Sequence, residues 1–323
     1  MPDYQKKDGF LTQRAEENNS ITTELLIPMP PFPKNIMIEL SNACNSTCVF
    51  CTNSKMTRPK GVIRDELLDS VLNQAYKLGT REVGFYTTGE PFVYKRLPEV
   101  IQKAKQLGYE YVYLTTNGAL AVPDRAVSVI QAGLDSIKFS INAANEQTYH
   151  RIHGKDDFNT VIDNLRFIKE YRDKHSFSMR IGVSYVVTDD NRNEKNIAVQ
   201  LLTPLVDDLI FAEQGNQGGY MNENNVPPIM RVPCSMLFKR FHVSHEGYYT
   251  MCCVDYQNYL AVADLNNVSL AEAWTSELAV EMRKRHIDRR IEGTLCHNCI
   301  KAVNDNVKPL IEKYATIFDF NKS

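Results

Sequence analysis

The sequence predicts an α/β fold, a partial (β/α)6 barrel of the TIM type followed by a small α+β domain. Strand-like segments alternate with helical ones over residues 35–225, which is typical of a parallel sheet with right-handed crossovers. Six such strands fall short of the eight that a closed TIM barrel needs. The eight cysteines form an early and a late group, with none between positions 52 and 233, which indicates metal or redox chemistry at two places.

Composition narrows the class of protein. The chain has 323 residues, of which 43% are hydrophobic and 24% charged, and its net charge is −2. This balance, without a Lys/Arg-rich tract, argues against nucleic acid or an anionic membrane as a partner. No apolar run approaches the ~20 residues of a membrane span, and residues 1–15 lack the apolar region of a signal peptide. We therefore expect a cytoplasmic protein in which disulfides do not form.

The candidate elements follow in order along the chain. Residues 1–34 are expected to form an extended lead-in, because the prolines between positions 28 and 33 disfavour both helix and sheet. Val161, Leu165 and Ile168 recur at helical spacing and predict a helix over residues 157–175. The candidate strands are Asn35–Leu40, Glu82–Tyr86, Tyr109–Leu114, Ser136–Ile141, Arg180–Val187 and Asp208–Ala212.

Polar motifs follow these strands at the point where each strand ends. Cys44–Cys51 follows the first strand, Thr87–Pro91 the second and Thr115–Gly118 the third. Ser140, Ile141 and Asn142 end the fourth strand, and Glu213-Gln214 follows the sixth. Because the carboxyl ends of parallel strands meet at one edge, we expect all five motifs to face the same rim, where α/β folds place their active sites.

The early cysteines have a spacing suited to an iron–sulfur cluster. Cys44, Cys48 and Cys51 form a C-x3-C-x2-C loop, with Phe50 just before the last cysteine. Three thiolates can hold three irons of a [4Fe–4S] cube and leave the fourth iron open to a substrate. A zinc knuckle is the alternative, but zinc usually takes four protein ligands, and no fourth Cys or His lies nearby in the sequence.

These residues resemble those of the radical S-adenosylmethionine (SAM) enzymes. Thr88-Gly89-Glu90 stands where that family has a Gly-Gly-Glu motif. The resemblance implies that the open iron binds the amino and carboxylate groups of SAM, and that Glu90 accepts a hydrogen bond from the methionyl amine. It further implies that Phe50 packs beside the adenine and that Ser140 reaches the ribose or carboxylate. The SAM contacts implied in this way are Phe50, Thr88, Gly89, Glu90, Asn117, Ser140 and Asn142.

Several of these residues also have a plain structural interpretation. The segment from Thr88 to Pro91 could be a tight turn before a helix, and Asn117-Gly118 suits a turn with positive φ. Ser140 could be an ordinary strand-end hydroxyl. Asn142 stands where members of the family often carry Asp, which weakens its assignment.

The late cysteines lie beyond a loop rich in Gly, Asn and Pro, over residues 214–233, which indicates a domain boundary. We expect a core over residues 35–225 and a second domain over 226–323. Residues 238–243 and 248–252 predict a hairpin, and residues 269–286 a helix that Ser269 and Glu272 cap. Four cysteines can fill all iron sites of an auxiliary [4Fe–4S] cluster, although zinc suits four thiolates too.

The second domain resembles the Twitch domain, the shortened form of the SPASM domain that follows radical SAM cores. In that resemblance the auxiliary ligands are Cys234, Cys252, Cys296 and Cys299, and Cys253 is the spare cysteine. No cysteine follows Cys299, so we expect one auxiliary cluster at most. The cysteine spacing is similar to that of carbohydrate-acting radical SAM enzymes such as 2-deoxy-scyllo-inosamine dehydrogenase.

The resemblance implies a radical reaction on a small molecule. One electron, from a flavodoxin- or ferredoxin-type donor, would cleave SAM to a 5′-deoxyadenosyl radical that abstracts a substrate hydrogen. The expected outcome is oxidation of a carbinol of a sugar- or cyclitol-like substrate, with the auxiliary cluster as electron acceptor. The substrate base is not identified: Arg180, Glu213, Tyr220, His150 and His153 lie near strand ends, and each could be structural.

Three alternatives remain open. A carbohydrate epimerase would use a thiol, with Cys253 as the candidate, to return a hydrogen atom to the opposite face. A peptide-modifying enzyme is possible because many SPASM proteins act on peptides, although only 34 residues precede the core. A cluster-bearing electron carrier would leave Phe50, Glu90 and Ser140 without a purpose.

Overall fold

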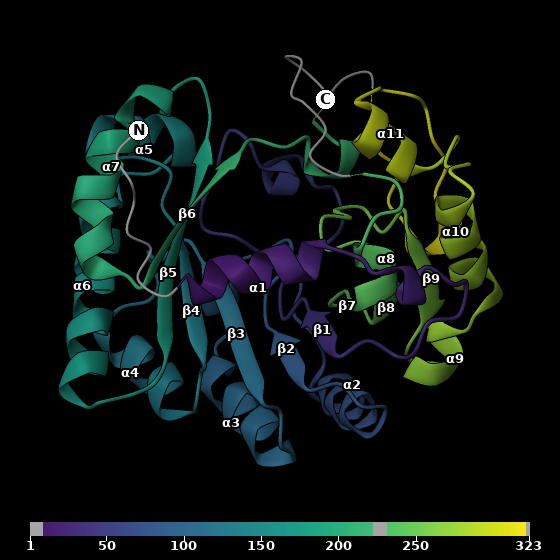
Figure 1. Ribbon diagram of the computed structural model, residues 1–323, viewed down its shortest axis with the longest axis horizontal. Helices are drawn as coiled ribbons and strands as arrows, with labels where there is room; N and C mark the ends of the chain where they lie inside the picture. The colour runs from purple at the N-terminus through teal and green to yellow at the C-terminus, as the bar shows by residue number, and fades with distance from the viewer. Residues whose placement is uncertain (1–8, 222–230, 321–323) are drawn as a thin grey trace.

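The computed structural model describes residues 9–221 and 231–320. Within them one sheet runs in the order β6-β5-β4-β3-β2-β1-β7-β8-β9 (Figure 1). Each neighbouring pair from β1 to β6 is parallel, which confirms the partial six-stranded barrel. These strands are β1 (Asn35–Ile38), β2 (Glu82–Gly84), β3 (Tyr111–Thr116), β4 (Ser136–Ser140), β5 (Arg180–Val187) and β6 (Asp208–Glu213).

Six helices alternate with these strands and cover the outer face of the sheet. In β3, Val112 and Leu114 are fully buried, whereas Tyr111 and Tyr113, which alternate with them, are half-buried and face the barrel interior. Within the described residues no helix is both long and apolar enough to cross a membrane. The outer helices are α2 (Asp65–Lys77), α3 (Leu97–Leu107), α4 (Pro123–Gln131), α5 (Glu146–His153), α6 (Phe158–Lys174) and α7 (Lys195–Leu202).

The C-terminal part extends the same sheet. Strand β7 (Arg240–Val243) pairs in parallel with β1, and β8 (Tyr248–Thr250) pairs antiparallel with β7, which confirms the hairpin. The boundary expected at residues 225–226 lies outside the described residues. The remaining elements are β9 (Ala261–Asp264), α8 (Met236–Lys239), α9 (Leu270–Trp274), α10 (Glu277–Ile287) and α11 (Leu295–Lys301).

One helix expected from the sequence is divided in two. The capping box of Ser269 and Glu272 is present, but the chain leaves the helical conformation after Trp274, and Ser276 has a ψ of 149°. The buried side chain of Arg283 donates to the carbonyl of Trp274 at 2.9 Å. This tertiary hydrogen bond takes an acceptor that a continuous helix would need for its own backbone.

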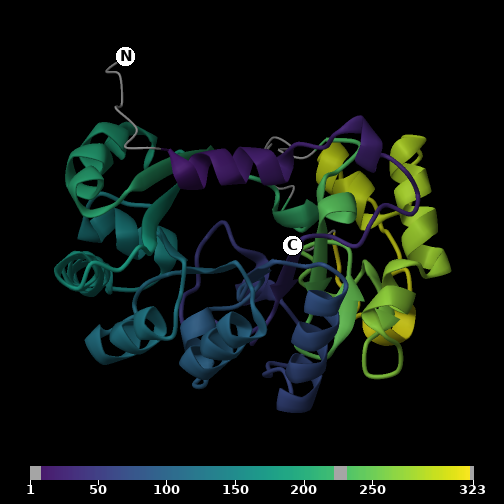
Figure 2. The same ribbon diagram turned by 60° about the horizontal axis from the view of Figure 1, so that its bottom comes forward.

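The expectation of an extended lead-in is wrong for its first half. Residues Phe10–Asn19 form the helix α1, which lies on the side of the sheet opposite the outer helices (Figure 2). No proline lies between positions 3 and 27, so proline does not restrict this segment. Asp208, the first residue of β6, accepts from the N–H of Leu11 at 3.2 Å, and Glu82, the first of β2, pairs with Arg14 at 2.7 Å. The helix therefore crosses the barrel interior at the amino ends of the strands.

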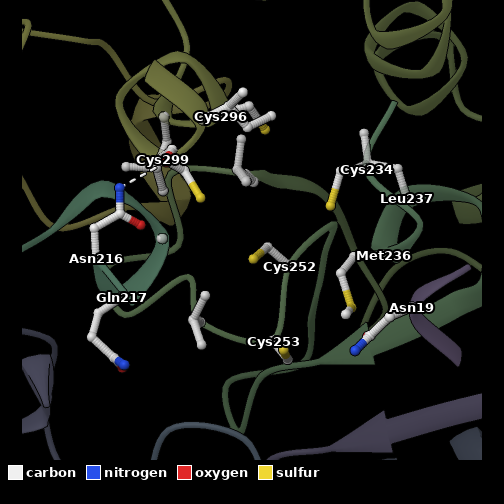
Figure 3. Close-up of a pocket in the computed structure, with 15 residues that line it drawn as sticks. Asn19, Asn216, Gln217, Cys234, Met236, Leu237, Cys252, Cys253, Cys296 and Cys299 are labelled. Atoms are coloured by element: carbon white, nitrogen blue, oxygen red, sulfur yellow. Dashed lines mark hydrogen bonds between the residues drawn. The ribbon is translucent and has the colours of Figure 1, made fainter. Parts of the chain in front are cut away.

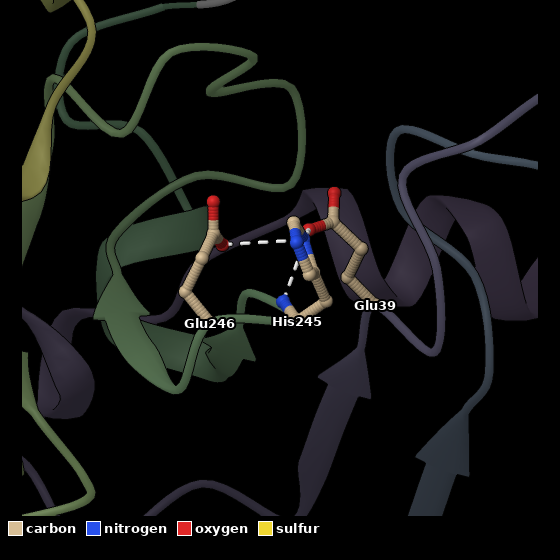
Figure 4. Close-up of side chains that lie close together, drawn as sticks. All are labelled: Glu39, His245 and Glu246. Atoms are coloured by element: carbon tan, nitrogen blue, oxygen red, sulfur yellow. Dashed lines mark hydrogen bonds and ion pairs between the residues drawn. The ribbon is translucent and has the colours of Figure 1, made fainter. Parts of the chain in front are cut away.

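A buried network of charges joins the barrel to the C-terminal part (Figure 4). Glu39, just after β1, accepts from Arg58 at 2.8 Å and from the His245 backbone N–H at 3.0 Å. Arg58 also donates to Glu246 at 2.8 Å. Burial alone would raise the pKa of Glu39, but the Arg58 charge and the hydrogen bonds of His245 and Thr88 outweigh it and hold that pKa below its usual range. The Arg58 guanidinium contacts both carboxylates, and a metal ion placed beside them would meet its positive charge. We therefore interpret the cluster of Glu39, His245 and Glu246 as part of an ion-pair network rather than as a metal site.

We expect Arg58→Met to destabilise the protein by about 3–5 kcal/mol, because it leaves the Glu39 carboxylate buried without its partner. Arg96→Met is the matched control, since Arg96 pairs with Asp65 at the surface, with side chains 57% and 52% exposed. Such a pair contributes less than about 1 kcal/mol. Urea unfolding of the reconstituted proteins, followed by circular dichroism, measures both. Equal midpoints for the two variants would contradict the role of the network.

Candidate metal-cluster sites

The loop Cys44–Cys51 leaves the carboxyl end of β1 and rests on the last turn of α5. The backbone N–H groups of Thr47 and Val49 donate to the carbonyls of His153 and Ile152, at 3.1 and 2.9 Å. The last carbonyls of a helix have no partner within the helix itself. The loop therefore completes the hydrogen bonding of α5, and the helix in turn fixes the path of the loop.

Hydrogen-bond donors converge on the sulfur atoms of this loop. The backbone N–H groups of Ser46 and Asn53 lie 3.5 Å from the Sγ atoms of Cys44 and Cys51, respectively. Burial raises the pKa of the Cys44 thiol to about 11, so the free thiol is protonated near neutral pH. Iron binds the thiolate and releases that proton. Donors placed around the sulfurs then stabilise the negative charge, so the loop fits a cluster with three protein ligands.

His153 contributes a further donor whose tautomer is fixed by its neighbours. The side-chain oxygen of Asn142 accepts from the Val186 N–H at 2.7 Å, so the Asn142 amide nitrogen faces His153 and donates to Nε2 at 3.2 Å. Burial lowers the pKa of His153 to about 4, which keeps the ring neutral at physiological pH. A neutral ring that accepts at Nε2 carries its proton on Nδ1. Nδ1 lies 3.4 Å from the Sγ of Cys48 and therefore donates to that sulfur.

Thr88, Gly89 and Glu90 lie directly against the start of the cysteine loop. A Cβ atom on Gly89 would come within 2.2 Å of the Ser41 carbonyl oxygen, so only glycine fits between the two segments. The backbone N–H of Glu90 donates to the Ala43 carbonyl at 2.9 Å. The structure thus brings together the two motifs that the sequence placed one strand apart.

The carboxylate of Glu90 is buried but not saturated. Its Oε1 accepts from the Thr116 hydroxyl at 2.7 Å and the Phe92 N–H at 2.9 Å, and its Oε2 accepts from the Asn117 N–H at 2.8 Å. A carboxylate has about four lone-pair positions, so one on Oε2 remains for a further donor. Burial raises the pKa of Glu90 despite these bonds. A cationic donor such as an ammonium group would therefore bind there favourably and restore the ionised form.

The remaining residues predicted to contact SAM have different surroundings in the structure. The Asn117 amide donates to the Asn45 side chain in the cysteine loop at 2.8 Å, and Phe50 is buried within the loop. Ser140 is half-buried at the end of β4, and no hydrogen bond joins it to the loop within the described chain. The side chain of Asn142 binds the Val186 N–H and His153, so it positions the His153 ring. Direct contact of these residues with SAM stays a prediction.

The late cysteines come together around one cavity of about 250 Å³ (Figure 3). Cys296 and Cys299 lie one turn apart on α11, while Cys234 precedes α8 and Cys252 follows β8. All four predicted auxiliary ligands line this cavity. Most of the remaining wall is apolar and consists of Met236, Leu237, Val254, Leu260, Leu295 and Ile300.

The separation of these sulfurs favours a cluster over a single zinc ion. Thiolates bound to zinc at about 2.3 Å stand roughly 3.8 Å apart in a tetrahedral site. Among the residues that the structure describes, no three cysteine sulfurs lie within 4.8 Å of one another. The thiols instead surround an open cavity, which suits a [4Fe–4S] cube with a ligand at each corner.

Two residues of the C-terminal part lie between the cysteine sets. Cys253 lines the auxiliary cavity and also a smaller cavity that Thr88 and His242 share. The hydroxyl of Tyr256, three residues later, lies 3.5 Å from the Sγ of Cys51. The segment that carries an auxiliary cysteine therefore reaches the first cysteine loop directly.

Sequence reasoning did not identify three residues that hold the first site. Asn53 donates to the Thr88 carbonyl at 2.6 Å, and its position two residues after Cys51 is the only local signal for it. His153 was placed only among possible substrate contacts. Tyr256 gives no signal, because its partner lies about two hundred residues earlier in the chain.

Comparison with known protein families decides the assignment. Residues 38–194, which include the first cysteine loop and Glu90, match the model of the radical SAM superfamily. The chain belongs to the radical SAM superfamily. Residues 234–300, which contain all the late cysteines, match the SPASM iron–sulfur cluster-binding domain. The cofactors of this radical SAM enzyme are accordingly SAM, its [4Fe–4S] cluster and an auxiliary iron–sulfur cluster.

Curated relatives share the radical SAM half of the chain. A "Probable GTP 3′,8-cyclase" of Saccharolobus solfataricus is 36% identical over 161 residues, which are 50% of this chain and 50% of that protein. One of Sulfolobus acidocaldarius is 28% identical over 159 residues, or 49% of this chain and 48% of that protein. The chain thus spans about half the length of the curated relatives it matches.

Solved structures resemble nearly the whole fold at low identity. BtrN in complex with AdoMet and 2-DOIA has a TM-score of 0.59 at 17% identity, covering 88% of this chain and 98% of that one. Streptococcus suis SuiB bound to the precursor peptide SuiA has a TM-score of 0.63 at 14% identity, covering 85% and 70%. For anSMEcpe with bound AdoMet the TM-score is 0.62 at 14% identity, covering 88% and 89%.

We expect His153→Phe to lower the reduction potential of the SAM-site cluster, because the variant ring still stacks on Tyr149 but has no N–H for the Cys48 sulfur. One hydrogen bond is worth about 1 kcal/mol, which corresponds to a shift on the order of 50 mV for one electron. The donor stabilises the more negative, reduced cluster, so its loss shifts the potential downward.

An anaerobic redox titration followed by electron paramagnetic resonance measures this shift. His150→Phe is the matched control, since His150 lies on the exposed side of the same helix and pairs with Asp156. An unchanged potential in His153→Phe with full iron content would show that the hydrogen bond does not act on the cluster.

Proposed function

We propose that this radical SAM enzyme oxidises a carbinol of a sugar- or cyclitol-like small molecule to a ketone, with the auxiliary [4Fe–4S] cluster as electron acceptor. The carrying observation is the set of four thiols around one apolar cavity next to the barrel. A cluster with four protein ligands has no open iron for a substrate, but it can accept an electron. The short connection from Cys51 to Tyr256 keeps this cavity beside the first cysteine loop.

The electron balance of the reaction assigns a task to each site. Conversion of CH–OH to C=O removes a hydrogen atom, a proton and an electron. When bound, the first cluster and SAM would supply the radical that takes the hydrogen atom, and the auxiliary cluster would supply an acceptor for the electron. The hydroxyl proton would pass to solvent. The chain itself would hold three irons through Cys44, Cys48 and Cys51, and would offer the open Oε2 position of Glu90 to the methionyl amine. A flavodoxin- or ferredoxin-type protein would deliver the first electron.

The extents of the structural matches favour a small-molecule substrate. The chain covers 98% of BtrN, whose structure holds 2-DOIA, against 92% of anSMEcpe with a bound Cp18Cys peptide and 70% of SuiB with a precursor peptide. Of these three, the match that extends over the largest share of the other chain is thus the one with a small-molecule ligand. The cyclase relatives match over about half of their length, so their reaction is less informative.

An epimerase is the alternative that a specific observation supports. Cys253, the cysteine left over from the expected ligand set, lines both the auxiliary cavity and a small cavity that Thr88 also lines. A thiol in that place could return a hydrogen atom to the opposite face of a substrate radical. Peptide modification remains a further possibility, because structures of that kind share the fold.

Turnover of candidate polyols in D₂O separates these reactions. We expect one 5′-deoxyadenosine for each ketone formed and no solvent deuterium on carbon. Cys253→Ala should keep at least about half of the wild-type rate, because its small thiol has no task in the oxidation. Mass spectrometry of the product, with iron content as the control for cluster loading, provides the measurement. An inverted carbon that carries deuterium, and is lost in Cys253→Ala, would identify an epimerase.

A further inference from the structure

A second cavity, of about 80 Å³, lies inside the barrel between the sheet and α1. Leu11, Arg14, Ala15 and Asn18 recur at helical spacing and form the α1 side of this cavity. The strands contribute mostly polar side chains to the opposite wall. These are Tyr86, Tyr111, Tyr113, Thr115, Ser136, Lys138 and Arg240.

The carboxylates at this end of the barrel already have partners. Glu82 pairs with Arg14 at 2.7 Å and accepts from the Asn35 amide at 2.8 Å. Asp208 accepts from the backbone N–H of Leu11 at 3.2 Å. The negative charge available here is therefore used to hold α1 in place.

Two cations that line the cavity have no such partner. Neither Lys138 nor Arg240 makes an ion pair with a carboxylate within residues 9–221 and 231–320. The Nη1 of Arg240 donates to the Met236 sulfur at 3.3 Å, which is a weak acceptor, and its Nε is buried without a hydrogen-bond partner. An unpaired guanidinium withdrawn from water is costly unless an anion joins it.

Lys138 and Arg240 lie below the rim of the barrel at which the cofactor would bind. Lys138 lies two residues before Ser140 on β4, so both side chains face the interior, and Lys138 sits about 7 Å farther from the cofactor rim. Arg240 begins β7 opposite Asn35, on the side of the barrel that adjoins the C-terminal part. A group held between them would lie below the rim at which the radical forms.

We propose that Lys138 and Arg240 form a subsite for an anionic group of the substrate, a phosphate or a carboxylate. The proposal rests on the proposed function and narrows its substrate class to acidic or phosphorylated carbohydrates. The planar fork of Arg240 suits the oxygens of either group, and Lys138 adds a compact charge. An amino-substituted cyclitol would instead place an ammonium group near two cations. The anion would also orient the substrate, with the reacting carbon toward the rim.

Anion binding to the reconstituted, SAM-loaded protein tests this subsite without turnover. Isothermal titration with inorganic phosphate and with acetate provides the two probes, and glucose is the uncharged control. We expect the wild type to bind at least one anion, and Lys138→Met and Arg240→Met each to weaken that binding by about tenfold or more. Stronger binding of phosphate than of acetate would indicate a phosphorylated substrate, and the reverse an acid.

Two control variants separate loss of the subsite from a general charge effect and from misfolding. Lys308→Met removes an exposed charge far along the chain and should bind the anion like the wild type. Arg240→Lys keeps the charge but loses the planar fork, so it should bind the anion more tightly than Arg240→Met and more weakly than the wild type. No anion binding by the wild type, or equal binding by wild type and both Met variants, would overturn the subsite. Anion binding without alcohol oxidation would refute the proposed function alone.

Discussion

The buried carboxylate of Glu39 holds together the parts on which the reaction site depends. It stands at the end of β1 and accepts hydrogen bonds from Arg58, beyond the cysteine loop, from Thr88 and from His245 in the C-terminal part. A charge buried in this way is tolerated only while its partners stay in place. The constraint therefore fixes the cysteine loop, the Thr88-Gly89-Glu90 motif and the C-terminal hairpin relative to one another.

The same arrangement defines the space in which a substrate can react. The cofactor rim lies at the carboxyl ends of the strands, α1 crosses their amino ends, and the C-terminal part joins β1 through β7. A substrate inside the barrel would meet the SAM site above, Lys138 and Arg240 below, and the auxiliary cavity to one side. Under the proposed function, a source of radicals and an acceptor of electrons would then both adjoin the barrel interior.

Much of this architecture was predictable because it depends on local patterns. Five of the six barrel strands begin at the expected residue, and the spacings of the two cysteine sets indicate iron–sulfur cluster binding. Helix α1 was missed because Asp208 and Glu82, which hold it, lie far along the chain. The Cys48–His153 contact and the cations of the barrel cavity were missed for the same reason, since no local pattern shows which distant side chains a fold brings together.

We propose that one chain holds a cluster that starts the radical reaction and a separate cluster that receives the electron. Iron and acid-labile sulfide counts after anaerobic reconstitution test it most directly. The account predicts about eight irons per chain in the wild type and about four in a Cys296→Ala/Cys299→Ala variant, at four irons for each cube. About four irons together with bound zinc in the wild type would contradict it, because zinc cannot accept the electron.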